Sequence, residues 1–167
     1  MKEKIFTRGN GEKVTYSKAI SIIASYLAAS PKAEYEVTIG TDSQTSNVTK
    51  YSEVIAIHRI GDGGIFFYHN DYVERVHNLK DKIYEETYRS LNNANGFIDA
   101  LDLELIKLDV DINTLNIHFQ IHCDVGHDGK TRTLIREVTA WVESLGYEVS
   151  IKPESYAASS IANKISK

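Results

Sequence analysis

The stretch Ile39-Gly40-Thr41-Asp42-Ser43-Gln44 carries the strongest signal for the fold. Apolar residues alternate with polar ones from Tyr35 into this stretch, a pattern with period two that indicates a strand. The strand then runs into an acid followed by small polar and amide side chains. In open α/β sheets, ligands bind beyond the carboxyl ends of the strands. Asp42 is therefore a candidate binding residue, although an aspartate here could equally begin the following turn.

Strand-like and helical patterns follow one another in a definite order around this stretch. Helical spacing marks residues 17–30, 79–105, 128–145 and 153–165, and strand-like patterns mark residues 54–60, 65–68, 115–123 and 147–151. Successive strands followed by helix–strand alternation predict an α/β fold with one mixed sheet covered by helices. We expect one domain over residues 1–167, with residues 1–16 as a loosely ordered arm and Ser17 capping an extra N-terminal helix. The Asn-rich and Gly-containing residues 92–96 predict a kink or a break in the long helix.

The amino-acid composition limits the classes of protein to which this chain can belong. The 167 residues suit one domain, and the apolar content of 42% with 25% charged residues is typical of a globular chain. A net charge of −4 argues against a basic surface over the whole molecule, although a local basic rim is compatible with it. The single cysteine, Cys123, excludes an internal disulfide. No apolar run approaches the roughly 18 residues of a membrane span, and the polar N-terminus lacks a signal-peptide pattern, so we expect a cytoplasmic protein without a membrane partner.

A second acid ends another apolar strand just before a glycine. Period two places Asp124 on the same face as His122, opposite the apolar residues of the strand. A strand buried on both faces would not carry a polar face. This face therefore lines a site or, alternatively, is the solvated face of an edge strand.

A third acid lies on the apolar stripe of the long helix. At about 100° per residue, Glu86 falls on the same side as Ile83 and Ser90. An acid on a core-facing stripe is costly unless a positive group meets it. A salt bridge to Arg75 or Lys82 is the alternative explanation.

These three acids are expected to meet. Two strands joined through a crossover helix pair in parallel within one sheet, so Asp42 and Asp124 would emerge at the same end, with Glu86 above them. Three converging carboxylates repel one another unless a cation joins them. Mg²⁺ and Mn²⁺ prefer such oxygen ligands, and two ions about 4 Å apart can activate water at a phosphodiester.

Other polar residues allow further interpretations. His122, Asp124 and His127 could together hold zinc, although His122 is more simply a supporting polar residue. Lys130, Arg132, Arg136 and Lys152 could hold phosphates near a metal, or could belong to solvated surfaces.

Three motifs together resemble the YkuK-type bacterial family of ribonuclease H-like proteins. They are Ile39-Gly40-Thr41-Asp42-Ser43-Gln44, the strand end His122-x-Asp124-x-Gly126, and Lys152-Pro153-Glu154-Ser155-Tyr156-Ala157-Ala158-Ser159-Ser160. The resemblance implies a ribonuclease H-like fold, with a five-stranded mixed sheet in the order βββαβαβα and helices on both faces. It also implies a nuclease site that holds Mg²⁺ or Mn²⁺.

The resemblance assigns roles to individual residues. Asp42, Glu86 and Asp124 match the acids that hold metal in the wider superfamily. Many members place a fourth acid, an aspartate, near the final helix, and here Glu154 is the charged candidate. The side chains expected to support these ligands are Ser43, His122, Ser159 and Asn163.

Two functions from different classes follow. The first is a divalent-metal-dependent nuclease that hydrolyses phosphodiester bonds of nucleic acid with Asp42, Glu86, Asp124 and Glu154. The alternative is a noncatalytic ribonuclease H-like module that binds nucleic acid or a protein partner. The charge of −4 and the missing fourth aspartate favour the alternative, whereas the placement of the three acids favours the enzyme.

Overall fold

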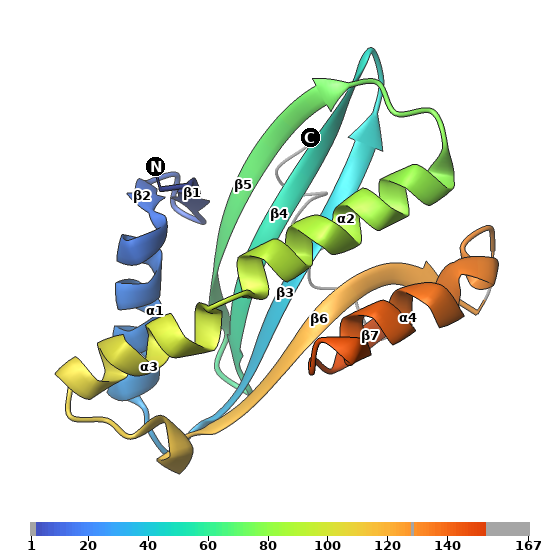
Figure 1. Ribbon diagram of the computed structural model, residues 1–167. Helices are drawn as coiled ribbons and strands as arrows, with labels where there is room; N and C mark the ends of the chain where they lie inside the picture. Colours follow the sequence, from blue (N-terminus) through green and yellow to red (C-terminus); the bar gives the residue numbers. More distant parts are fainter. Residues whose placement is uncertain (1–2, 128, 153–167) are drawn as a thin grey trace.

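The computed structural model describes residues 3–127 and 129–152, which form a single mixed sheet flanked by helices (Figure 1). This arrangement confirms the predicted α/β class. The sheet has seven strands in the order β2-β1-β5-β4-β3-β6-β7, and the expectation of five strands is therefore wrong. The two additional strands come from the N-terminal segment.

The described part of the N-terminal segment, residues 3–16, is not the loosely ordered arm that its polarity predicted. Strands β1 (Ile5–Arg8) and β2 (Lys13–Thr15) form a hairpin, and β1 continues the sheet by pairing with β5. Phe6 is fully buried, and this burial holds a segment whose composition is otherwise polar. Helix α1 (Tyr16–Ala29) follows directly, and Thr15 rather than Ser17 caps it by accepting a hydrogen bond from the backbone N–H of Lys18.

The three successive strands that the sequence predicts are present and are longer than expected. Strands β3 (Glu34–Thr45), β4 (Val48–Arg59) and β5 (Gly64–Glu74) pair antiparallel in sequence order. The turn between β4 and β5 uses two glycines with positive φ, Gly61 at 81° and Gly63 at 76°. Their conformations allow the chain to reverse tightly between two long strands.

The predicted long helix is broken in two. Helix α2 (Leu79–Ala94) begins with Asn78 as its N-cap, and α3 (Phe97–Lys107) follows after a two-residue interruption. Gly96 adopts a left-handed conformation with φ of 75°, which an α-helix cannot contain. The break that the residues around 92–96 predicted is thus confirmed.

The C-terminal half adds parallel strands. After the short 3₁₀ turn Ile112–Thr114, strand β6 (Asn116–Gly126) pairs parallel with β3. A second 3₁₀ turn, Arg132–Leu134, leads into α4 (Ile135–Ser144), and β7 (Val149–Lys152) pairs parallel with β6. The helix expected at 153–165 lies outside the described residues.

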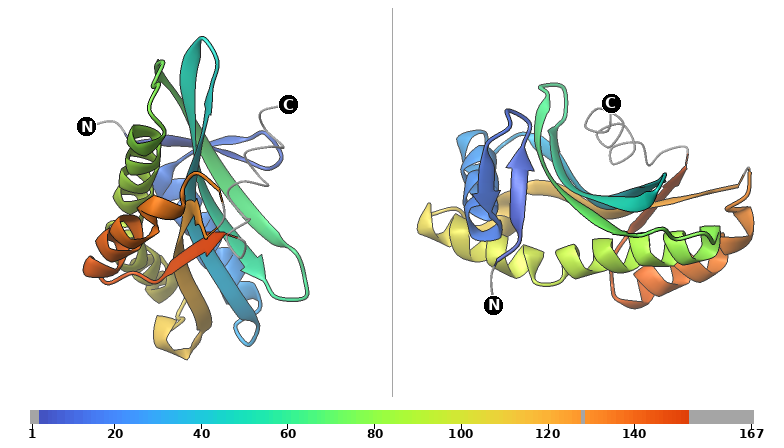
Figure 2. Two further views of the ribbon diagram at one scale, coloured as in Figure 1. Left: turned by 90° about the vertical axis from the view of Figure 1, so that its right-hand side faces the viewer. Right: turned by 90° about the horizontal axis from the view of Figure 1, so that it is seen from above.

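Figure 2 shows α2, α3 and α4 running along one side of the curved strands. Apolar residues of the sheet and of these helices form one continuous core, which includes Val37, Ile39, Ile55, Phe97, Leu101 and Val138. Among the described residues, no helix is long and apolar enough to cross a membrane. The fold thus places α2 directly over the central strands, which sets the position of the candidate site.

Candidate metal centre

Strand pairing brings two of the predicted acids to the same edge of the sheet. Strands β3 and β6 are parallel, and Gly40 lies opposite His122 in their register. Asp42 and Asp124 each lie two residues beyond this pair, so both emerge at the carboxyl end of a strand. The predicted parallel arrangement is therefore present, and it follows from the crossover through α2 and α3.

Helix α2 brings the third acid to this edge. The hydroxyls of Thr41 on β3 and Ser90 on α2 are 2.9 Å apart and form a buried hydrogen bond between strand and helix. Glu86 lies one turn before Ser90 on the same side of α2, as the helical period predicts. The helix thus carries Glu86 over the end of β3.

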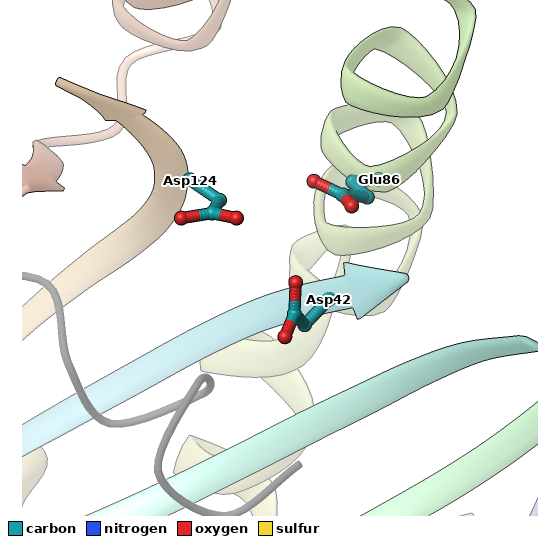
Figure 3. Close-up of side chains that lie close together, drawn as sticks. All are labelled: Asp42, Glu86 and Asp124. Carbon is teal, nitrogen blue, oxygen red and sulfur yellow. The ribbon is translucent and has the colours of Figure 1, made fainter. Parts of the chain in front are cut away.

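The three carboxylates converge. One ligand oxygen from each of Asp42, Glu86 and Asp124 lies within 4.8 Å of the others. Figure 3 shows the three side chains turned toward one another from β3, α2 and β6. This spacing is short enough for one divalent cation to contact all three carboxylates.

The environment of Glu86 suits a bound cation. The residue is 5% exposed, its Oε2 accepts a 2.5 Å hydrogen bond from the hydroxyl of Ser43, and its Oε1 is buried without a hydrogen-bond partner among the described residues. A buried carboxylate oxygen without a partner is costly. The salt bridge to Arg75 or Lys82 that would explain Glu86 structurally is not found in the described part of the chain. A Mg²⁺ or Mn²⁺ ion would supply the interaction that Oε1 lacks, and the donor set suits either ion.

Burial and mutual repulsion raise the pKa values of two of the acids. The pKa of Asp42 is raised to about 6, mainly because burial disfavours its charge and secondly because Asp124 is close. The backbone N–H of Ser43 donates to Asp42 Oδ1 at 3.0 Å, which partly opposes this shift. The pKa of Glu86 is raised well above its usual value, again mainly by burial. Such a cluster binds protons when it has no cation, so proton and metal compete for it.

His122 does not support the acids through a hydrogen bond. Its ring is buried, and neither nitrogen has a hydrogen-bond partner among the residues described. Burial lowers the pKa of His122 to about 4, so the ring is neutral at physiological pH. Within residues 3–127 and 129–152, the group whose ligand atoms lie close enough to hold a metal is Asp42, Glu86 and Asp124, and not the zinc set that includes His122 and His127.

Lys152 lies in the site, where it forms an ion pair with Asp124 that the sequence did not predict. Its Nζ is 2.8 Å from Asp124 Oδ1, and this ion pair raises the pKa of Lys152. Lys152 lies opposite Gly126 in the register of β6 and β7. The sequence offered Lys152 either as a possible phosphate ligand or as part of a solvated surface. Its contact with Asp124 depends on the pairing of β7 with β6, which is a tertiary feature.

A second buried acid, Glu53, belongs to a different cluster. It is 1% exposed, and its carboxylate receives Lys4 at 2.5 Å, Arg89 at 2.9 Å and Asn93 at 2.8 Å. Sequence reasoning missed this cluster, although an acid next to the apolar run of β4 was a usable signal. Because Lys4 and Arg89 contact Glu53, the burial of this acid needs no metal ion. Glu86 differs because no positive side chain forms an ion pair with it among the described residues.

Three predicted residues are not placed. Glu154, Ser159 and Asn163 lie outside the described residues, so their roles stay predictions. Of the supporting side chains predicted from the resemblance, Ser43 contacts Glu86 directly.

Comparison with known proteins agrees with this fold. A family model described as ribonuclease H-like matches residues 18–167, and the chain therefore belongs to the ribonuclease H-like family. The chain is also similar to the uncharacterised protein YkuK of Bacillus subtilis (strain 168), with 33% identity over 159 residues that cover 93% of this chain and 92% of the relative. No solved structure gave a significant match.

Proposed function

We propose that this protein is a divalent-metal-dependent nuclease that hydrolyses phosphodiester bonds in nucleic acid. The observation that carries the proposal is the convergence of Asp42, Glu86 and Asp124 with a buried, unpartnered oxygen on Glu86. An acidic cluster that served only the fold would satisfy its oxygens with donors, as the cluster around Glu53 does.

Each residue of the centre has a definite task in this proposal. A bound Mg²⁺ or Mn²⁺ would supply Lewis-acid chemistry for water and for the phosphodiester. Asp42 and Asp124 would hold the ion from the two strands, and Glu86 would hold it from the helix. Ser43 would orient Glu86 through its hydroxyl. His122 is buried two residues before Asp124 on β6, and its supporting role stays a prediction.

A hollow at the start of helix α4, called here the basic hollow, offers two arginines to a nucleic-acid backbone. It has a volume of about 680 Å³ and is lined by residues that follow Asp124 in the sequence, namely His127, Arg132, Thr133, Ile135, Arg136, Glu137 and Thr139. Arg132 and Arg136 are exposed there and can contact phosphates. Such a local basic rim is compatible with the net charge of −4.

The noncatalytic module remains the second candidate because one observation favours it. Lys152 already neutralises part of the charge of Asp124, and it would compete with a metal ion for Oδ1 of that residue. In this reading the basic hollow would bind nucleic acid without cleavage.

Cleavage assays with the purified full chain separate the two functions. Labelled single-stranded and duplex DNA, RNA and RNA–DNA hybrid are incubated with Mn²⁺ or Mg²⁺, and the proposal expects cleavage that Asp42→Asn abolishes. Asp62→Asn is the matched control, since Asp62 lies in the β4–β5 turn with its side chain 75% exposed. If metal binds but none of these substrates is cut, the noncatalytic module is the better description.

A further inference from the structure

The ammonium group of Lys152 lies against the three acids because of a specific backbone arrangement. Lys152 ends β7 opposite Gly126, the last residue of β6. A Cβ on Gly126 would lie 2.9 Å from the Cβ of Lys152, closer than packed side chains allow. The missing side chain therefore lets Lys152 lie against the end of β6, from where its Nζ reaches back to Asp124 Oδ1 at 2.8 Å.

Lys152 acts on the whole cluster and not on Asp124 alone. The charges of Asp124, Asp42 and Glu86 all favour its protonated form. In return, Lys152 partly opposes the shift in the pKa of Asp42. The ammonium group thus interacts with all three carboxylates, although the Lys152 side chain is 50% exposed to solvent.

We propose that the ammonium group of Lys152 takes the place of a second cation in this centre, so that Asp42, Glu86 and Asp124 hold a single divalent ion. The inference rests on the proposed function in one respect, namely that the three acids hold an ion. It goes further by assigning the number of ions and the residue that determines it.

Charge balance supports a single ion. One divalent ion and one ammonium neutralise the three carboxylates, whereas a second divalent ion would leave an excess of two positive charges in a partly buried site. Lys152 also forms an ion pair with Oδ1 of Asp124, so this oxygen is less available to a second ion. Removing the lysine frees this oxygen and lowers the excess charge that two divalent ions would leave from two to one.

The experiment counts Mn²⁺ ions on the metal-free full chain. Calorimetric titration gives the number bound, and electron paramagnetic resonance reports whether two ions lie within the roughly 4 Å that couples them magnetically. We expect one uncoupled ion in the wild type and in Lys152→Arg, and a coupled pair in Lys152→Gln. The first ion should bind Lys152→Gln about tenfold more tightly, because a nearby positive charge is gone.

Lys107→Gln is the matched control. It makes the same change in net charge on α3, where Lys107 pairs with Glu104, away from the acids. This variant should bind one ion with the affinity of the wild type.

Several outcomes would overturn the inference. Two ions on the wild type would do so, even if Lys152→Gln could not be obtained folded. A single, more tightly bound ion on Lys152→Gln would do so too, because Lys152 would then only compete for the metal position. A wild type that binds no Mn²⁺ would instead remove the proposed metal centre itself, and this result is distinct from the other two.

Discussion

The hydroxyl of Ser43 donates a 2.5 Å hydrogen bond to Oε2 of Glu86 and so joins the end of β3 to α2 inside the carboxylate cluster. A second hydroxyl pair, Thr41 with Ser90 at 2.9 Å, joins the same two elements one helical turn away. The Ser43 contact is partly buried and the Thr41 contact is fully buried. The first holds a proposed metal ligand and the second does not.

This pair of contacts gives a matched test. Ser43→Ala leaves Glu86 buried without its donor, and we expect it to lower the free energy of unfolding by about 1–3 kcal/mol and to weaken Mn²⁺ binding. Ser90→Ala should cost about 1 kcal/mol and leave Mn²⁺ affinity unchanged. Urea unfolding in EDTA and Mn²⁺ titration measure the two effects. Equal losses of Mn²⁺ affinity in both variants would contradict a specific role of Ser43.

Removing one acid should stabilise the metal-free protein. Asp42→Asn relieves the desolvation of a buried charge and its repulsion from Asp124, and we expect a gain of about 1–2 kcal/mol at pH 7.5 in EDTA. The same variant should lose the rise in melting temperature that Mn²⁺ gives the wild type. Thermal melts with and without Mn²⁺ measure both, with Asp62→Asn as the control that changes neither. A metal-free Asp42→Asn that is less stable than the wild type would mark Asp42 as a structural residue.

The raised pKa of Asp42 predicts a pH dependence of definite sign. Its ordinary pKa of 3.8 becomes about 6 in the folded protein, so between these values the folded state binds more protons than the unfolded state. The metal-free wild type therefore loses up to about 3 kcal/mol of stability from this group as pH rises from 3.8 to 6. The lowered pKa of His122 gives the opposite slope, and the comparison is therefore wild type against Asp42→Asn, which retains His122.

Protons and Mn²⁺ compete for the carboxylate of Asp42. Mn²⁺ should therefore bind more tightly as pH rises through about 6. The increase in melting temperature caused by a fixed Mn²⁺ concentration should be clearly larger at pH 7.5 than at pH 5. An increase independent of pH would mean that Mn²⁺ does not bind at these carboxylates.

Glu53 offers a test of the distinction between structural and metal-binding acids. Glu53→Gln removes the charge that Lys4 and Arg89 contact, and we expect it to destabilise the protein by about 1–3 kcal/mol. The stabilisation by Mn²⁺ should be retained, because Glu53 does not belong to the metal cluster. Parallel urea titrations in EDTA and in Mn²⁺ measure this difference. Loss of the Mn²⁺ effect in this variant would place Glu53 in the site after all.

The basic hollow predicts a salt-dependent contribution to nucleic-acid binding. Arg132→Ala and Arg136→Ala should each weaken binding of labelled oligonucleotides and reduce the slope of log affinity against log salt by about 0.7–0.9. Arg8→Ala is the control, since Arg8 pairs with Glu12 on the N-terminal hairpin. Fluorescence anisotropy at several salt concentrations measures the slopes. Equal slopes in the wild type and all three variants would show that nucleic acid does not bind along the basic hollow.

Local sequence signals decided much of the architecture. Period-two alternation identified β3 and β6, helical spacing identified α2, and the residues around Gly96 predicted the break before α3. These signals suffice because each depends on neighbours within one element. The N-terminal hairpin escaped them because Phe6 contributes a single large apolar side chain, and its partner strand β5 is about 60 residues away.

By itself the sequence determined that Asp42, Glu86 and Asp124 are acids at positions that packing does not explain. It also placed Asp42 and Asp124 near the ends of strands and Glu86 on the apolar face of a helix. Only the tertiary structure decided that Ser43 holds Glu86, that Lys152 reaches Asp124, and that positive groups satisfy Glu53. The physical reason is that the spacing of apolar residues along the sequence shows only which face of its own strand or helix a residue occupies. The partner of a buried charge depends on strand register and helix packing between distant segments, which no local pattern records.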